Sequence, residues 1–309
     1  MDSEEPDRPK IRLAKVIALR GISSRRGAED LIREGRVAVN SLVVTKVATL
    51  VDPMVDKIRV DGQGLPAEPK KAYYICYKPR GVLTAMDTGD KNRPSVMIMI
   101  ENLDIRGGVE PVGRLEFNAE GALILTNDGE LANKLSHPSA QVPRRYIAKC
   151  YRTPGPRALK ALEKGVVTPD GNFLPVLARI IDQTDGENAW IEVTVVQPGA
   201  QLVPRMLAAL GHPVSKLRRE SYATISIRGL ERGGVRPLTA QEVTRLRDIA
   251  DGIQPKKAGK AWRGVGFAKA KPKPTRMKRA PRVKTAAKKP ESRKPASRKP
   301  EARNPAKKK

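Results

Sequence analysis

The sequence is poor in the residue types on which metal sites and disulfide frameworks depend. It contains two cysteines and two histidines in 309 residues, and only 4% of its residues are aromatic. Cys76 and Cys150 have neither metal-ligand nor redox spacing, so we expect both to be reduced and buried. The two histidines lie far apart and each precedes a proline. No metal site is therefore predicted.

Long apolar runs are absent as well. No stretch approaches the roughly 20 apolar residues of a membrane helix. The first residues, MDSEEPD, lack the basic and then apolar pattern of a secretory signal. We therefore expect a cytoplasmic protein without membrane attachment. The apolar fraction of 39% is still large enough for a hydrophobic core in most of the chain.

Acidic residues are too few to balance the basic ones, and the formal net charge is +27. Residues 254–309 hold 22 Lys and Arg against two Glu, together with eight prolines. Such a segment cannot bury enough apolar area to fold, so we predict a disordered basic tail. The charge favours a polyanionic partner such as RNA, because basic side chains that neutralise phosphates release counterions. An anionic membrane surface and a role in solubility are the alternatives. Binding to a membrane surface would require an interfacial helix with an apolar face, which the tail lacks.

Residues 1–10 are polar and are predicted to be disordered. Residues 11–60 have the pattern of two short helices and a strand hairpin, with Gly21 ending the first helix and Ser23 capping the second. The hairpin is expected to turn at Asn40-Ser41. The run RLAKVIALRGISSRRGAEDLIREGRVAVN resembles the small RNA-binding module first named in ribosomal protein S-four, although Ser41 stands where glycine is usual.

Three arginines of this module are candidate RNA contacts. Arg25 and Arg26 open the second helix, where backbone amides already favour anions. Arg36 follows the end of the same helix. A solvated basic helix face is the alternative for any single arginine, but the whole pattern favours phosphate binding.

Residues 61–72 have the glycine, proline and charge content of a linker. In residues 73–253, short strands alternate with helices, which indicates an α+β domain. The clearest elements are a buried strand at Ala122–Leu125 that ends in a polar turn and helix, and a helix over residues 156–164. Thr239 and Glu242 form a capping box that opens the last helix.

The stretch PVGRLEFNAEGALILTNDGELANKLSHP carries the most specific signal in the sequence. It resembles the signature G-R-L-D-x-x-T-x-G-L-L-x-L-T-N-D-G-x-L of the RsuA-like family of ribosomal RNA pseudouridine synthases. The resemblance implies a mixed, mainly antiparallel sheet with helices, and a cofactor-independent isomerisation of uridine. It also implies that Glu116 stands in the place of the catalytic aspartate and that Arg114 lies beside the RNA.

Three further segments extend the resemblance to about residues 11–250. KPRGVLTAMD resembles the family's entry strand, so Lys78 and Arg80 are candidate contacts of the RNA backbone. VPRRYIAKC resembles the segment whose tyrosine lies against the target base, which implies this role for Tyr146 and an RNA contact for Arg145. QPGAQLVPRMLAALGHPV resembles the loop that holds the catalytic residue's arginine partner.

In this last segment the family's arginine would fall on Val203 or Pro204, neither of which carries a charge. Arg205 is the nearest guanidinium, so it is a candidate RNA contact and a candidate replacement for the missing arginine. Because the catalytic residue and its partner are both altered, two functions are open.

The first function is that of a pseudouridine synthase, an isomerase that acts on a specific uridine of ribosomal RNA through Glu116. The second is that of a catalytically silenced family member, which binds RNA or assists ribosome assembly. In either case we expect a monomer without cofactor or metal, whose partner is ribosomal RNA or a ribosomal precursor particle. The target uridine and the ribosomal subunit are not specified by the sequence.

Overall fold

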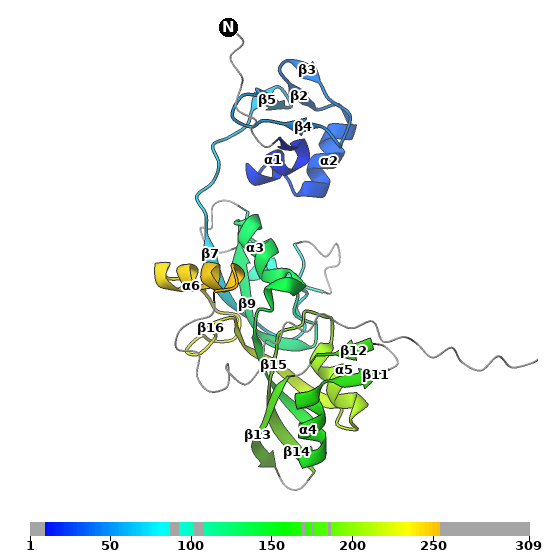
Figure 1. The fold of residues 1–309 in the computed structure, drawn as a ribbon. Helices are drawn as coiled ribbons and strands as arrows, with labels where there is room; N and C mark the ends of the chain where they lie inside the picture. Colours follow the sequence, from blue (N-terminus) through cyan, green and yellow to red (C-terminus); the bar gives the residue numbers. More distant parts are fainter. Residues whose placement is uncertain are drawn as a thin grey trace, which may run out of the picture. The chain divides into compact units, whose positions relative to one another are not determined.

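The computed structural model describes residues 10–86, 93–101, 108–168, 171–174, 176–184 and 187–253. The two segments predicted to be disordered, 1–10 and 254–309, lie outside these ranges except for Lys10. The described residues form a small amino-terminal module and a larger sheet domain, each with its own hydrophobic core (Figure 1).

The small module consists of two helices and short antiparallel strands, as predicted. Leu13 and Ile17 of the first helix and Ile32 of the second are fully buried against the strands. Ser24, and not Ser23, caps the second helix, because its hydroxyl accepts a hydrogen bond from the Gly27 amide at 3.1 Å. The elements are β1 (Ile11–Arg12), α1 (Leu13–Leu19), α2 (Arg25–Arg33), β2 (Val37–Val39), β3 (Leu42–Val43), β4 (Leu50–Val51), β5 (Ile58–Val60) and β6 (Gln63–Gly64).

Two-residue turns connect β2 to β3 and β5 to β6. Asn40 and Ser41 have φ angles of 50° and 70°, and Asp61 and Gly62 have φ angles of 50° and 76°. Paired positive φ angles suit the tight turns that join twisted antiparallel strands. The first turn lies where the sequence predicts it. The second adds β6 to the module, so its sheet extends to Gly64, beyond the predicted boundary at residue 60.

The larger domain is built on one mixed sheet. Its strand order is β13-β14-β10-β15-β9-β7-β17, with β16 paired to β15 and β8 paired to β9. Every pairing in this sheet is antiparallel except that of β15 with β9. This confirms the predicted α+β class with a mixed, mainly antiparallel sheet.

The strands of this domain, including the separate pair β11-β12, are β7 (Tyr73–Lys78), β8 (Glu110–Pro111), β9 (Ala119–Thr126), β10 (Arg144–Tyr151), β11 (Val166–Thr168), β12 (Gly171–Phe173), β13 (Leu177–Thr184), β14 (Asn188–Val195), β15 (Val214–Tyr222), β16 (Ile225–Ser226) and β17 (Val235–Pro237). The helices are η1 (Val96–Met99), α3 (Gly129–Ser136), η2 (Pro138–Ala140), α4 (Pro156–Lys164), α5 (Leu202–Ala209) and α6 (Ala240–Ala250).

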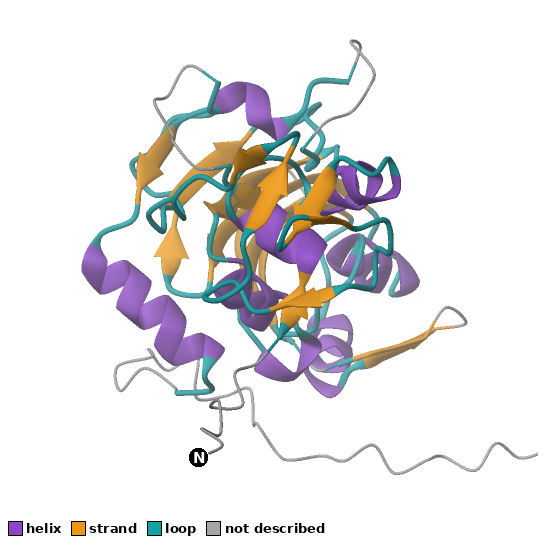
Figure 2. Ribbon diagram, turned by 90° about the horizontal axis from the view of Figure 1, so that it is seen from above, coloured by secondary structure: helices purple, strands orange, loops and turns teal. Residues whose placement is uncertain are grey.

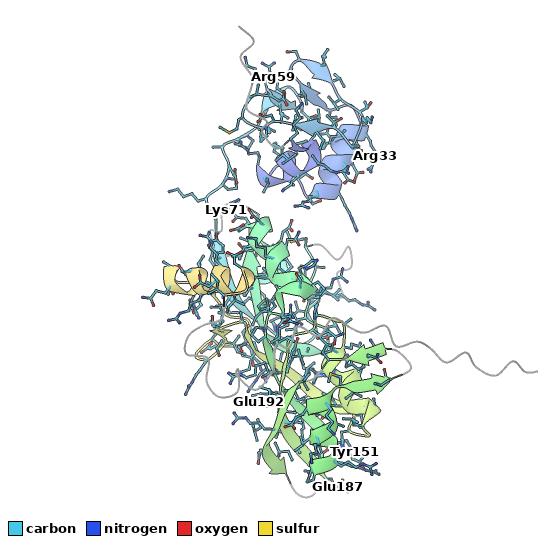
Figure 3. All side chains as sticks on the ribbon, in the orientation of Figure 1. Arg33, Arg59, Lys71, Tyr151, Glu187 and Glu192 are labelled. Atoms are coloured by element: carbon cyan, nitrogen blue, oxygen red, sulfur yellow. The ribbon has the colours of Figure 1, made fainter. Side chains whose placement is uncertain are left out.

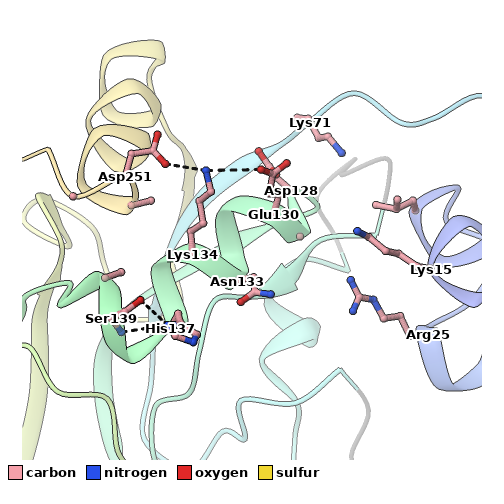
Figure 4. A pocket seen from close by; sticks show the side chains of 15 residues that line it. Lys15, Arg25, Lys71, Asp128, Glu130, Asn133, Lys134, His137, Ser139 and Asp251 are labelled. Atoms are coloured by element: carbon pink, nitrogen blue, oxygen red, sulfur yellow. Dashed lines mark hydrogen bonds and ion pairs between the residues drawn. The ribbon is translucent and has the colours of Figure 1, made fainter. Parts of the chain in front are cut away.

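Helices cover different parts of this sheet and bury two main cores (Figure 2). Helices α4 and α5 pack on β10 and β14, whereas α3 and α6 pack near β7 and β9. Lys134 of α3 and Asp251 at the end of α6 form an ion pair at 2.8 Å that joins these two helices (Figure 4). The predicted capping box of Thr239 and Glu242 is present at the start of α6.

Both cysteines are buried and free, as predicted. Burial raises the pKa of the Cys76 thiol to about 12. Among the described residues, no helix is long and apolar enough to cross a membrane.

Candidate active site

Glu116 lies on a tight turn that leads into β9. Its neighbours in sequence, Leu115 and Ala119, are 2% and 1% exposed, so the turn is anchored in the core at both sides. The Thr84 hydroxyl donates to the Leu115 carbonyl at 2.8 Å and accepts from the Leu115 amide at 3.3 Å. The Ala119 amide closes the turn by donating to the Glu116 carbonyl at 3.0 Å. The backbone of Glu116 is therefore held in place on both sides.

The side chain of Glu116 points to the start of α5. Its Oε1 accepts a hydrogen bond of 2.8 Å from the backbone amide of Gln201, the residue that precedes the helix. The amino-terminal end of a helix favours negative charge. The other carboxylate oxygen, Oε2, is buried without a hydrogen-bond partner.

Tyr146 approaches the same region from β10. It is 9% exposed, and its side chain packs in the core between the sheet and α5. Across the sheet, Tyr146 is in register with Val193 of β14 and with Arg219 of β15, and Arg219 is in register with Gly121 of β9. Gly121 is in turn in register with Lys78 of β7. One row across five strands thus runs beneath the site.

Gly121 allows β9 and β15 to approach each other closely in this row. Its φ angle is +121°, and a Cβ atom there would lie 2.2 Å from the carbonyl oxygen of Arg219. A larger residue would clash with this backbone and would also be strained, so only glycine fits without a shift of the strands.

Glu116 and Tyr146 face a common cavity of about 930 Å³. Among the described residues, Glu116 is the only carboxylate that lines it. The basic side chains of the lining are Arg114, Arg144, Arg205 and Arg219. The cavity is therefore strongly electropositive around one carboxylate, and it has the size of a ligand-binding pocket.

Arg144 is buried in this cavity wall and is fixed by neutral oxygen atoms. Its guanidinium donates to the carbonyls of Val142 and Val196, each at 3.2 Å, and to that of Leu135 at 3.3 Å. It also donates to the Tyr222 hydroxyl at 3.1 Å. These bonds orient the guanidinium but leave its charge uncompensated.

Arg219 is buried in a similar way and is 1% exposed. Its Nε donates to the Ala122 carbonyl at 2.6 Å, and its Nη1 donates to the Arg114 carbonyl at 3.1 Å. Its Nη2 is buried without a hydrogen-bond partner. The guanidinium lies 5.2 Å from the centre of the Tyr222 ring, so the same ring is close to both buried arginines.

Lys78 is completely buried at the end of the same row. Its ammonium group donates to the carbonyls of Pro79 and Val82 at 2.9 and 2.8 Å. Its pKa is lowered from 10.5 to about 8, mainly by burial; Arg219 also lowers this pKa, whereas Cys76, Glu116 and Glu120 raise it. Lys78 therefore lies inside the protein, which does not allow the RNA backbone contact that the sequence predicts for it.

The start of α5 has no arginine at the two positions where the resemblance places one. Val203 is 2% exposed and belongs to the core, and Pro204 lies in the first turn of the helix, where a missing amide is tolerated. Arg205 lines the cavity, and its guanidinium lies 5.2 Å from the centre of the Phe173 ring. The hydrogen bond that holds the Glu116 carboxylate comes from the backbone of Gln201.

The remaining candidate RNA contacts lie outside this cavity. Arg80, Arg25 and Arg26 are exposed. Arg36 forms a two-pronged ion pair with Asp61, at 2.7 and 2.8 Å, and this pairing raises the pKa of the Arg36 guanidinium.

Arg145 points to the opposite face of the sheet from Tyr146. There it forms an ion pair at 3.5 Å with Glu192, which is labelled in Figure 3. Neighbouring residues of a strand point to opposite faces, so Arg144 and not Arg145 shares the cavity with Tyr146.

The sequence analysis did not identify Arg144 and Arg219 as site residues. A signal for Arg144 was present, because it lies two residues before Tyr146 on one strand and must face the same side. No local pattern placed Arg219 at the site, although its strand resembles the family, because its position there depends on the parallel pairing of β15 with β9. Among the described residues, no group of three His, Cys, Asp or Glu side chains could hold a metal ion.

A small two-helix module joined to a mixed sheet, with a carboxylate and a tyrosine in one basic cavity, is the arrangement that the resemblance to RNA pseudouridine synthases implies. Comparison with known proteins specifies the class further. Residues 72–192 match the RNA pseudouridylate synthase family, and residues 11–56 match the S4 domain. The chain belongs to the RNA pseudouridine synthase family, in its RsuA-like branch, which confirms the resemblance seen in the sequence.

The relatives are similar over three quarters or more of their length. The ribosomal large subunit pseudouridine synthase B of Bacillus subtilis (strain 168) is 42% identical over 241 residues, which are 78% of this chain and 97% of the relative. The protein of the same name from Yersinia pestis is 35% identical over 249 residues, or 78% of this chain and 76% of the relative. A solved pseudouridylate synthase structure has a TM-score of 0.55 at 24% identity, covers 76% of this chain and 99% of its own, and supports the fold.

Proposed function

We propose that the chain isomerises a uridine of ribosomal RNA to pseudouridine, with Glu116 as the catalytic carboxylate. The reaction breaks the bond between C1′ of ribose and N1 of the base, and forms a bond between C1′ and C5. The proton lost from C5 is balanced by the proton gained at N1, so the reaction needs no oxidant, reductant or cofactor. The ribosomal substrate is proposed because the relatives from Bacillus subtilis and Yersinia pestis are ribosomal large subunit pseudouridine synthases by name.

The observation that carries this proposal is the convergence of Glu116 and Tyr146 on one cavity. A base must leave its stack before an enzyme can act on it, and the flipped base then needs a pocket with an aromatic wall. Tyr146 supplies that wall in our proposal. The four arginines of the lining suit a nucleotide, because each nucleotide of RNA brings a phosphate.

We assign the RNA contacts to arginines inside and outside the cavity. Arg114 and Arg205 would contact the target nucleotide and its neighbours, since both line the cavity. Arg80, Arg25 and Arg26 are exposed and would bind phosphates farther along the RNA. We propose that the protein acts as a monomer on ribosomal RNA or a precursor particle.

The test is pseudouridine mapping by mass spectrometry in ribosomal RNA from a deletion strain. The strain is complemented with the wild type, with Glu116→Gln, or with Glu120→Gln as the matched control. Glu120 lies in the same stretch but pairs with Arg232 at 3.2 Å and does not line the cavity. One modified site should return with the wild type and with Glu120→Gln, and not with Glu116→Gln. If no site depends on the protein, the proposed activity is excluded.

A second candidate function is RNA binding without catalysis. It is favoured by the uncharged residues Val203 and Pro204 and by the longer side chain of Glu116. One extra methylene moves the carboxylate by about 1 Å, which can cost about 10²-fold in rate. This function predicts that the wild type and Glu116→Gln bind ribosomal RNA equally well and that neither forms product. Product formed by the purified wild type excludes it.

A further inference from the structure

The site contains a buried cation that no role described so far requires. We propose that Arg219 is the positioning cation of the active site: its guanidinium replaces the arginine that the start of α5 lacks and orients the Glu116 carboxylate. This inference rests on the proposed function, because it assigns a partner to the proposed catalytic residue.

Arg219 lies in the row of residues that crosses the sheet beneath the site. It is in register with Tyr146 on one side and with Gly121 on the other. Directly opposed side chains in neighbouring strands lie roughly 5 Å apart. Because Gly121 has no side chain, the backbone of β9 comes close to the backbone of Arg219, and β9 begins only three residues after Glu116. Arg219 is therefore next to Tyr146 in the sheet and close to the turn that carries Glu116.

Arg219 also holds the turn that carries Glu116. Its Nη1 donates to the carbonyl of Arg114, two residues before Glu116, and its Nε donates to Ala122 in the strand that follows. The planar guanidinium thus connects the backbone on both sides of the turn. A lysine has a single ammonium group and cannot make both bonds with the same geometry.

Glu116 and Arg219 each have a buried polar atom without a hydrogen-bond partner, one an acceptor and the other a donor. Oε2 of Glu116 and Nη2 of Arg219 are both buried without hydrogen-bond partners, and both residues line the same cavity. An acceptor and a donor left unsatisfied in one cavity are costly unless they meet each other or a shared ligand. We assign to Nη2 a charge-assisted hydrogen bond with Oε2, made when the RNA closes the cavity.

The charges of Arg219 and Glu116 act on the same part of the protein interior. The structure gives Arg219 hydrogen bonds to carbonyl oxygens, so these contacts do not neutralise its charge. Both Arg219 and Glu116 act on the ammonium group of Lys78, in opposite directions. The carboxylate and the guanidinium therefore lie in one electrostatic field, in which burial weakens screening by solvent.

The first experiment compares single-turnover and steady-state kinetics of Arg219→Gln, Arg219→Lys and Arg218→Gln on ribosomal RNA. Arg218 is the matched control, because it is adjacent and points to the opposite face. Arg219→Gln should lower kcat by roughly 10²-fold with little change in KM, since orientation of a catalytic group is lost. Arg219→Lys should recover part of the rate. Adding Pro204→Arg to Arg219→Gln should restore rate by returning a guanidinium to α5. If Arg219→Gln and Arg218→Gln have equal kcat, the proposal is overturned.

The second experiment does not depend on product formation or on RNA. The pKa of Lys78 is measured by NMR titration of the full chain with ¹³C-labelled lysine, in the wild type, Arg219→Gln and Glu116→Gln. Arg219→Gln should raise this pKa above about 8, and Glu116→Gln should lower it. If both variants are folded and neither changes the pKa, the two groups do not share one field and the inference is wrong. A wild type that forms no product but shows both shifts would exclude the proposed function and leave the electrostatic pairing intact.

Discussion

Adjacent arginines of the same sheet point to opposite faces and have different kinds of partner there. Arg144 and Arg145 are neighbours on β10, and Arg218 and Arg219 are neighbours on β15. Arg144 and Arg219 point into the cavity, where carbonyl and hydroxyl oxygens accept their hydrogen bonds. Arg145 and Arg218 point to the other face, where each has a carboxylate partner.

The carboxylates of the second face keep its net charge low. Glu192 pairs with both Arg145 and Arg179, at 3.5 and 2.9 Å, and raises the pKa of Arg179. Glu220 lies 3.1 Å from Arg218, although this ion pair does not have hydrogen-bond geometry. Such partly exposed pairs contribute little stability.

The cavity face keeps its positive charge at a cost in stability, because a buried charge without a carboxylate partner is poorly compensated. Natural sequences accept such a cost mainly at functional sites. The difference between the two faces agrees with the proposal that the cavity face receives the RNA. It also yields predictions whose expected effects range from large to small.

The largest effect is expected for Gly121→Ala, which would disturb the strand pairing that positions Arg219. The new methyl group would meet the Arg219 carbonyl oxygen at 2.2 Å, at a φ angle of +121°. We expect a loss of roughly 3–5 kcal/mol in the free energy of unfolding, measured in urea. Gly64→Ala is the matched control, because a Cβ atom there meets nothing within 4 Å. Equal stability of the two variants would contradict the close approach of β9 and β15.

The next largest effect is the difference in the free energy of unfolding between Arg144→Met and Arg145→Met. Removing Arg144 takes its hydrogen bonds from the carbonyls of Val142 and Val196 and from the Tyr222 hydroxyl, whereas the Leu135 carbonyl still accepts from that hydroxyl at 2.9 Å, so we expect a loss of roughly 2–4 kcal/mol. Removing Arg145 breaks an ion pair whose arginine is 39% exposed, so we expect a loss of about 1 kcal/mol or less. Urea midpoints of the two variants measure the difference. A larger loss for Arg145→Met would reverse the proposed distinction between the faces.

A third effect is the pH dependence that Lys78 confers. Burial lowers its pKa from 10.5 to about 8 in the folded protein. Between these pH values the unfolded chain binds a proton that the folded protein does not, so the free energy of unfolding rises with pH. Relative to Lys78→Met, the wild type should gain about 1–2 kcal/mol between pH 8 and pH 10.5, after allowance for screening by solvent. Parallel pH profiles of the two proteins would show that the ammonium group is solvated.

The sequence predicts those features that depend on local patterns. The buried strand before Asn127, helix α4 and the capping box of Thr239 and Glu242 follow from periodicity and from end signals, and the structure contains them. The fold class follows from the signature around Glu116. The helix cap at Ser24 and the two-residue strand β6 were not predicted. Sequence patterns locate the ends of elements only to within one or two residues, and both features are of that size.

The electrostatics of the site was beyond prediction for a different reason. From the sequence, Lys78 is expected to be an exposed loop lysine because it precedes Pro79. Its burial depends on strands that are distant in sequence. The backbone amide of Gln201 carries no signal in the sequence, although it holds the Glu116 carboxylate. Contacts of this kind join segments that are about 85 residues apart, and single-sequence patterns extend over one element.

The smallest loss of stability is expected for breaking an ion pair outside the cavity, that of Arg236 with Glu242. Arg236 donates two hydrogen bonds of 2.9 Å to Glu242, which also closes the capping box of α6. This pairing lowers the pKa of Glu242 below 4.5, so its contribution is present above that pH and is lost as the pH falls through the lower, folded-state pKa. Arg236→Met should cost about 0.5–1 kcal/mol at pH 7, because the pair is partly exposed. Its cost should diminish when urea unfolding is repeated at lower pH. A cost at pH 7 as large as that of Arg144→Met would show that a carboxylate-paired arginine matters as much to this fold as the buried Arg144 of the cavity.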